Sequence, residues 1–264
     1  MAGVVRATGA EVRDWHVGDH VCGLLGGGGY AERVAVDARQ LLPIPEGWSF
    51  EHAAAVPEVF LTAWLNLFLE GQLRSGETVL IHAGASGVGT AAVQMARDAD
   101  CEVLVTASTE GKRERCRQLG ANFACDYRDT DFAVEIREFL DGNGVDVVLD
   151  VAGASHLARN LEVLAPQGRL VLLALLGGTE GAIDLGLVLR KRLRLIGSTL
   201  RSRSAAEKGG IINGFRGQFW DALLAGQIEP IIDRVLPIQE AAAAHDVIAS
   251  NSTIGKVVLS VRQT

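Results

Sequence analysis

Apolar residues follow one pattern up to about residue 77 and another beyond it. From Glu77 onwards, short apolar runs that suit buried strands alternate with amphipathic stretches of helical period. Alternation at these lengths predicts an α/β fold with a doubly wound parallel sheet. The expected strands are 79–83, 101–106, 122–126, 145–151, 169–173 and 193–199, and the expected helices are 88–96, 111–119, 132–140 and 156–164.

The two ends of the chain differ from this central region. The N-terminal part has short β-rich runs separated by turns, which we expect to be strands at 3–6, 17–25 and 30–36. After Thr199 we expect a polar loop at 201–210, helices at 215–224 and 240–248, and a last strand at 256–261. That strand has no obvious place in the parallel sheet. We therefore expect it to return to the N-terminal part, so that both ends build one domain around an inserted one.

Composition and charge narrow the classes of partner. The chain has 264 residues, a net charge of −7 and 48% hydrophobic residues. The acidic balance argues against nucleic acid as a partner. The apolar run 170–176 is too short to span a bilayer, and the first residues lack the pattern of a signal peptide, so we expect a cytoplasmic protein without a membrane segment.

The clearest chemical signal is the glycine-rich sequence that follows the strand 79–83. Glycines at these spacings allow a tight turn and let backbone N–H groups approach a pyrophosphate at the start of a helix. A turn that merely packs the helix against the strand would have similar spacing, but the strand and helix on either side favour a dinucleotide site in a Rossmann domain. Its candidate residues are Gly84, Ser86, Gly87, Val88 and Gly89.

The end of the second strand bears on the choice of nucleotide. Enzymes that use NAD place an acidic side chain there to bind the ribose 2′-hydroxyl, whereas this chain has Ala107 at that position. Ser108, Lys112 and Tyr127 can together hold a 2′-phosphate through charge-assisted hydrogen bonds. Glu110 argues in the other direction, and Lys112 could also be a solvated helix charge. On balance we expect NADP(H).

At this point the chain resembles a known family. The motifs are I-H-A-G-A-S-G-V-G, A-A-A-V-P-E-V-F-L-T-A-W, V-G-D-H-V, L-L-P-I-P-E-G and I-G-K-V-V-L. Together they are similar to the zeta-crystallin-like quinone oxidoreductases of the medium-chain dehydrogenase/reductase superfamily. The runs at 199–204 and 26–32 are most similar to the tumour-suppressor-induced members of that branch.

The resemblance implies a Rossmann NADP-binding domain at 61–207 and a GroES-like β-barrel substrate domain at 1–60 and 208–264, with the active site between them. It places Ser86, Gly87 and Val88 along the pyrophosphate, and Ser108, Lys112 and Tyr127 at the 2′-phosphate. It also implies that Thr62 lies near the nicotinamide, as do loop residues Gly153, Leu175, Leu176, Leu200 and Arg201. For the three leucines, ordinary packing of loops explains the pattern almost as well.

Two departures from the family pattern bear on metal and on the barrel. Metal-dependent relatives have a zinc-binding cysteine where this chain has Glu58, and Cys22, Cys101, Cys116 and Cys125 form no C-x-x-C pair. We therefore expect no metal, reduced thiols, and a structural role for His82. The start of the chain aligns with an internal strand of the family barrel. We thus expect a partial barrel, from either a natural short form or a start at an internal methionine.

Several functions remain open for a chain of this kind. The leading hypothesis is NADPH-dependent reduction of quinones without a metal, where the protein orients the reactants and excludes water. The alternatives are reduction of the double bond of an enone or 2-alkenal, and a cofactor-binding protein without turnover. We also expect a homodimer joined edge to edge at the strand 193–199.

Overall fold

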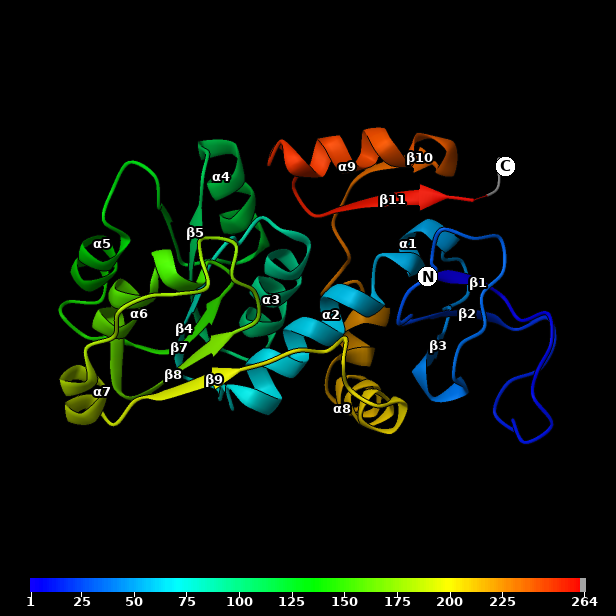
Figure 1. Ribbon diagram of the computed structural model, residues 1–264, viewed down its shortest axis with the longest axis horizontal. Helices are drawn as coiled ribbons and strands as arrows, with labels where there is room; N and C mark the ends of the chain where they lie inside the picture. The colour runs from blue at the N-terminus through cyan, green and yellow to red at the C-terminus, as the bar shows by residue number, and fades with distance from the viewer. Residues whose placement is uncertain (262–264) are drawn as a thin grey trace. The chain divides into compact units, whose positions relative to one another are not determined.

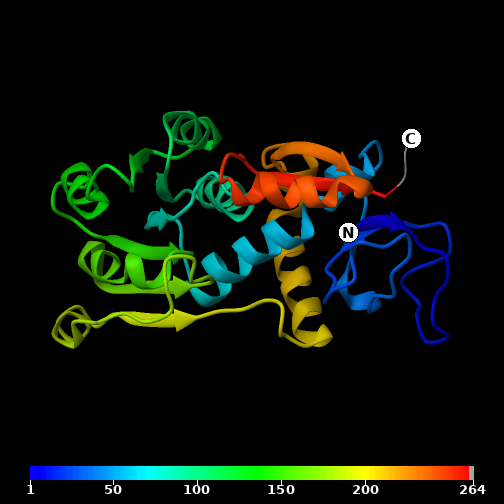
Figure 2. The same ribbon diagram turned by 45° about the horizontal axis from the view of Figure 1, so that its top comes forward.

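The computed structural model describes residues 1–261 and divides the chain into two compact units (Figures 1 and 2). Unit 2 is the continuous segment Ala63–Thr199, and unit 1 combines Met1–Thr62 with the part of the chain from Leu200 onwards. Residues 262–264, which belong to the expected substrate domain, lie outside the described residues.

Unit 2 is built around a six-stranded parallel sheet with the strand order β6-β5-β4-β7-β8-β9. The order reverses between β4 and β7, and ligands bind at such a switch point in open α/β sheets. This is the expected doubly wound Rossmann sheet. Its strands are β4 (Thr78–Ile81), β5 (Glu102–Ala107), β6 (Phe123–Asp126), β7 (Val145–Asp150), β8 (Leu164–Leu172) and β9 (Arg194–Gly197).

Side chains on both faces of this sheet are buried. Leu80, Leu104 and Val148 pack in one cluster with residues of α5 and α6. The alternating residues Val79 and Val103 are also fully buried, although they point to the opposite face. Continuous apolar strands of this kind need helices on each side. Beyond residue 70, the helices of unit 2 are α3 (Gly87–Asp98), α4 (Glu110–Leu119), α5 (Phe132–Phe139), α6 (Leu157–Val163) and α7 (Leu185–Lys191), with a 3-10 turn, η3, at Gly153–Ser155.

Residues 50–70 are helical, which sequence analysis did not anticipate. They comprise α1 (Phe50–Ala54), α2 (Pro57–Trp64) and a π-helical stretch, η2 (Leu65–Glu70). By length and composition alone the stretch Phe50–Glu70 could cross a membrane, but 67% of its apolar 18-residue part is buried inside the structure. Packing in the interior therefore accounts for its apolar character.

Unit 1 contains two separate small sheets. An antiparallel sheet joins β1 (Ala2–Val4), β2 (His20–Gly23) and β3 (Leu41–Pro43), and a parallel pair joins β10 (Ile232–Pro237) to β11 (Lys256–Ser260). Both views show α9 running beside this pair (Figures 1 and 2). The remaining elements are η1 (Ala38–Gln40), α8 (Ala205–Leu224), η4 (Ile238–Glu240) and α9 (Ala241–Ala249).

Two expectations for unit 1 are wrong. Residues 30–36 form no strand, and most are exposed after the glycine run, so that no apolar face holds them in a sheet. The expected loop 201–210 becomes helical at Ala205, because Ser204 and Glu207 form a capping box. The last strand pairs with β10, a strand that the sequence pattern did not predict, and it lies in the same compact unit as the N-terminal part of the chain.

Candidate functional site

The turn after β4 brings backbone unusually close to backbone. A β-carbon added to Gly89 would lie 2.3 Å from the carbonyl oxygen of Ala83, and one added to Gly84 would lie 2.8 Å from Cβ of Val105. Ser86 caps α3, because its side chain accepts a hydrogen bond of 3.0 Å from the N–H of Gly89. The first N–H groups of α3 have no partner within the helix and favour an anion. The turn therefore fits a dinucleotide pyrophosphate.

His82 supports this turn from inside the unit. Its ring nitrogens contact the side-chain oxygens of Thr106 on β5 (2.9 Å) and Asn160 on α6 (2.7 Å). The ring is 2% exposed, and its burial lowers the pKa of His82 to about 3. The imidazole is therefore neutral at physiological pH. The structural role expected for His82 is confirmed.

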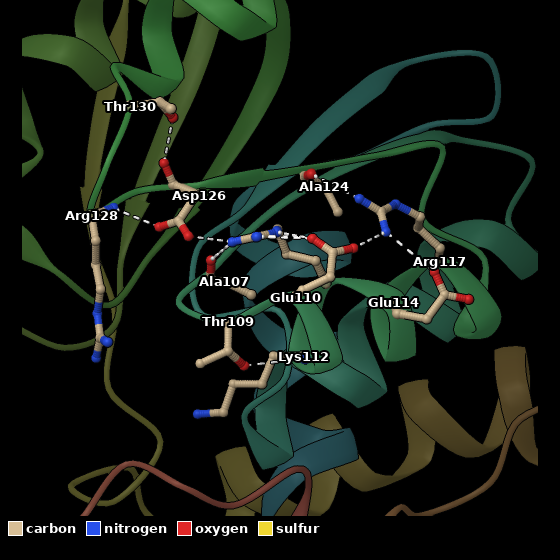
Figure 3. A network of polar contacts seen from close by, with 11 residues as sticks. Ala107, Thr109, Glu110, Lys112, Glu114, Arg117, Ala124, Asp126, Arg128 and Thr130 are labelled. Carbon is tan, nitrogen blue, oxygen red and sulfur yellow. Dashed lines mark hydrogen bonds and ion pairs between the residues drawn. The ribbon is translucent and has the colours of Figure 1, made fainter.

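The residues assigned to the 2′-phosphate follow β5 and β6, which are adjacent strands. Ser108 and Lys112 are only 8% and 7% exposed, so Lys112 is not a solvated helix charge. Thr109 caps α4 by accepting a hydrogen bond from the N–H of Lys112 (3.3 Å). Tyr127 is half-buried directly after β6, whose Asp126 pairs with Ala107 of β5. In Figure 3 the Lys112 ammonium points away from the Glu110 carboxylate.

A network of ion pairs at this edge was missed by sequence reasoning. Arg113 contacts Asp126 and also Glu110, whose Oε2 lies 2.8 Å from its Nη2. Arg117 contacts the other oxygen of Glu110 at 2.8 Å (Figure 3). The i,i+3 spacing of Glu110 and Arg113 indicates their contact. The pairing with Asp126 depends on strand adjacency, which local spacing does not reveal.

The loop after β7 adjoins the loop after β8. The buried carboxylate of Asp150 accepts hydrogen bonds from the N–H groups of Ala152 (2.8 Å) and Gly153 (3.0 Å), and burial raises the pKa of Asp150 to about 6. Gly153 has φ +71°, and a β-carbon there would lie 2.7 Å from Leu175 Cδ2. The structure therefore brings Gly153 and Leu175 together. Leu176 is 83% exposed, so packing within the described residues does not explain it, whereas Leu175 is 47% exposed and packs partly against Gly153.

Three of the expected site residues belong to unit 1. Thr62 lies in α2 and is buried, as is Leu200. The carbonyl of Arg201 accepts a hydrogen bond of 2.9 Å from Lys208 Nζ, while its side chain is exposed. For Leu200, packing remains a sufficient explanation. The nicotinamide-proximal roles of Thr62 and Arg201 stay predictions.

The cysteines carry protonated thiols in buried positions. All four are free and buried, and burial raises the pKa of Cys101 to about 11 and of Cys22, Cys116 and Cys125 to about 12. In residues 1–261, no three His, Cys, Asp or Glu side chains come together in a way that could hold a metal ion.

Two segments of the chain match known protein families. Residues 1–46 match the alcohol dehydrogenase GroES-like domain, and residues 87–211 match the family described as zinc-binding dehydrogenase. The first match covers β1, β2 and β3, and the second begins at α3 and includes most of the sheet of unit 2.

Two curated relatives align with almost the whole chain. Phthioceranic/hydroxyphthioceranic acid synthase of Mycobacterium tuberculosis is 38% identical over 266 residues, which cover 100% of this chain and 12% of the synthase. The chain thus spans a small fraction of the length of that protein. The 2-haloacrylate reductase of Burkholderia sp is 34% identical over 266 residues, which cover 98% of this chain and 78% of the reductase.

Two solved structures share the fold closely. The quinone oxidoreductase from Thermus thermophilus, determined also in complex with NADPH, is 34% identical with a TM-score of 0.84, covering 98% of this chain and 79% of that chain. The CurK enoyl reductase is 33% identical with a TM-score of 0.85, and the match covers 98% of this chain and 77% of the reductase chain.

Replacing Gly89 by Ala should weaken nucleotide binding. The added methyl group would collide with the Ala83 carbonyl, so the turn and the start of α3 have to move apart. We expect the Kd for NADPH, measured by fluorescence titration, to rise at least about tenfold. Gly111→Ala is the matched control, because Gly111 lies in the first turn of α4 with open space around it. Equal affinities in the two variants would contradict the proposed turn geometry.

The pH dependence of stability should depend on His82. Because its pKa is lowered in the folded state, the unfolded chain binds the proton more tightly, and stability falls as pH decreases from about 6.5 towards 3. Relative to His82→Gln, wild type should lose about 3 kcal/mol more of its free energy of unfolding between pH 7 and pH 4. Urea unfolding at the two pH values measures this difference. The loss would be the same in both proteins if the ring were not held neutral by burial.

Proposed function

Because the chain belongs to the medium-chain dehydrogenase/reductase superfamily, we propose that it is an NADPH-dependent oxidoreductase that reduces a carbon–carbon double bond conjugated to a carbonyl group. The observation that carries the proposal is the pairing of a turn that excludes β-carbons at Gly84 and Gly89 with a buried lysine after β5. The first feature suits a pyrophosphate, and the second suits a 2′-phosphate.

The nucleotide would bind along the carboxyl edge of the sheet. The N–H groups at the start of α3, with Ser86, Gly87 and Val88, would hold the pyrophosphate, while Ser108, Lys112 and Tyr127 would hold the 2′-phosphate. Gly153 and Leu175, which the structure brings together, would adjoin the nicotinamide half. Bound NADPH supplies a hydride.

The proposed substrate class is supported by the chemistry of the step and by two similar proteins. Hydride addition at the β-carbon of an enoyl group moves the double-bond electrons towards the carbonyl oxygen, and a proton then adds at the α-carbon. Orientation and exclusion of water are the protein's main tasks in the first step. The names of two similar proteins, 2-haloacrylate reductase and CurK enoyl reductase, support acceptors of this type.

Quinone reduction is the second candidate function. Its support is the similarity to the Thermus thermophilus quinone oxidoreductase, which was solved with NADPH. A quinone is electrophilic enough to accept reducing equivalents without an acid or base from the protein. Both reactions use the same nucleotide site, so they differ only in the acceptor.

Lys112→Ala should weaken the binding of NADPH more than the binding of NADH. Loss of the charge-assisted hydrogen bond to the 2′-phosphate should raise the KM for NADPH about 10- to 100-fold and leave the KM for NADH within about threefold. Steady-state kinetics with both nucleotides measures this. Arg115→Ala, on the same helix and bonded to Gln118, is the control and should leave both constants near wild type. An unchanged KM for NADPH in Lys112→Ala would contradict the assignment of Lys112 to the 2′-phosphate site.

Turnover with two acceptors should separate the candidate reactions. Purified chain and NADPH are mixed with a crotonyl thioester or with 1,2-naphthoquinone, and NADPH oxidation is followed by absorbance. We expect kcat/KM for the thioester to exceed that for the quinone, with deuterium from 4-deuterated NADPH found at the β-carbon of the saturated product. The reverse ranking would favour the quinone reaction. NADPH binding without either turnover would favour a cofactor-binding protein.

A further inference from the structure

Two carboxylates flank the place assigned to the 2′-phosphate. Glu110 is the first residue of α4, and Asp126 ends β6 opposite Ala107 of β5. An acidic side chain in this region favours a free ribose diol and repels a phosphate. The lack of an acid at Ala107 therefore does not by itself explain a preference for NADPH, because two other acids lie close by.

Arg113 contacts both carboxylates. Its Nη1 bonds Asp126 Oδ2, and its Nη2 and Nε donate to Glu110 Oε2 at 2.8 and 3.1 Å. Nη1 also reaches the carbonyl of Ala107 at 3.5 Å. The side chains of Arg113 and Asp126 are each 15% exposed, so their contact is largely shielded from solvent. Arg113 thus ties the end of β5 to the end of β6.

The remaining carboxylate oxygens have donors of their own. Glu110 Oε1 lies 2.8 Å from Arg117 Nη1, and Asp126 Oδ1 accepts the N–H of Arg128 at 2.9 Å. All four oxygens are therefore occupied (Figure 3). The pKa values of Asp126 and Glu110 are both lowered, the first chiefly by the Arg128 N–H and the second chiefly by Arg117. Both side chains stay ionised and turned towards arginines.

We propose that Arg113 is a positioning residue that sets the preference for NADPH over NADH. It neutralises Asp126 and Glu110 and holds them in ion pairs, so that neither opposes a 2′-phosphate near Lys112 nor reaches a ribose 2′-hydroxyl. This inference rests on the proposed nucleotide site. Without Arg113, Glu110 keeps Arg117, whereas Asp126 loses its only side-chain cation within the described network. Asp126 is thus the acid that the loss of Arg113 releases.

The test measures the Kd values of NADPH and NADH by fluorescence titration of the purified chain. In Arg113→Gln we expect the ratio of Kd for NADH to Kd for NADPH to fall at least about tenfold, mainly through weaker NADPH binding. Arg115→Gln removes the same charge from the same helix and should leave the ratio within about threefold of wild type. If this ratio fell equally in both variants, the effect would come from net charge, and the proposed role of Arg113 would be overturned.

A second variant separates repulsion from loss of structure. Arg113→Gln combined with Asp126→Asn removes the released carboxylate but keeps an oxygen for the Arg128 N–H, so the ratio should return to within about threefold of wild type. A ratio that stays low would overturn the proposal. Because this comparison uses a ratio within each protein, a uniformly destabilised variant does not mimic it.

The outcome for wild type distinguishes this inference from the proposed function. If wild type prefers NADPH and Arg113→Gln keeps that preference, the role of Arg113 fails and the nucleotide assignment stands. If wild type binds the two nucleotides equally or binds neither, the assignment of the phosphate site fails, and the inference fails with it.

Discussion

Backbone passes very close to backbone where β4 turns into α3. There is no room for a β-carbon at Gly84 or Gly89, and Ala83 takes a positive φ of 52° to make the turn. This packing fixes where α3 begins, and so where its N–H groups point. In the proposed nucleotide site, residues after the neighbouring strands would act together with this fixed helix start.

Two kinds of polar contact lie near the carboxyl ends of the strands, and they differ in charge. After β4, a neutral histidine joins Thr106 and Asn160 where a charge would be costly to bury. At the ends of β5 and β6, Arg113 and Arg117 form ion pairs with Asp126 and Glu110. The first contact supports the turn, and the second would change the electrostatic field that a charged ligand meets at the proposed site.

Sequence reasoning succeeded where a pattern is local. Most strands of unit 2 contain short apolar runs, and helix-like stretches separate them along the chain, so the alternation was readable. The stretch Phe50–Glu70 was not, because it is a long apolar run interrupted by few polar residues. α7 also escaped notice, since Leu185 and Leu189 point outwards, 70% and 78% exposed. The glycine turn and Lys112 were found from spacing, whereas the pairing of Arg113 with Asp126 requires knowledge of which strands are neighbours.

The division of unit 1 into two chain segments affects the order in which the protein can fold during synthesis. Its N-terminal part ends at Thr62, and its second part begins only at Leu200, after the whole of unit 2. Unit 2 is continuous and can fold as soon as it leaves the ribosome. At the usual rate of translation, the N-terminal part waits on the order of ten seconds for α8 and the β10–β11 pair. During that interval the apolar residues of α2 lack part of the packing that buries them in the finished fold.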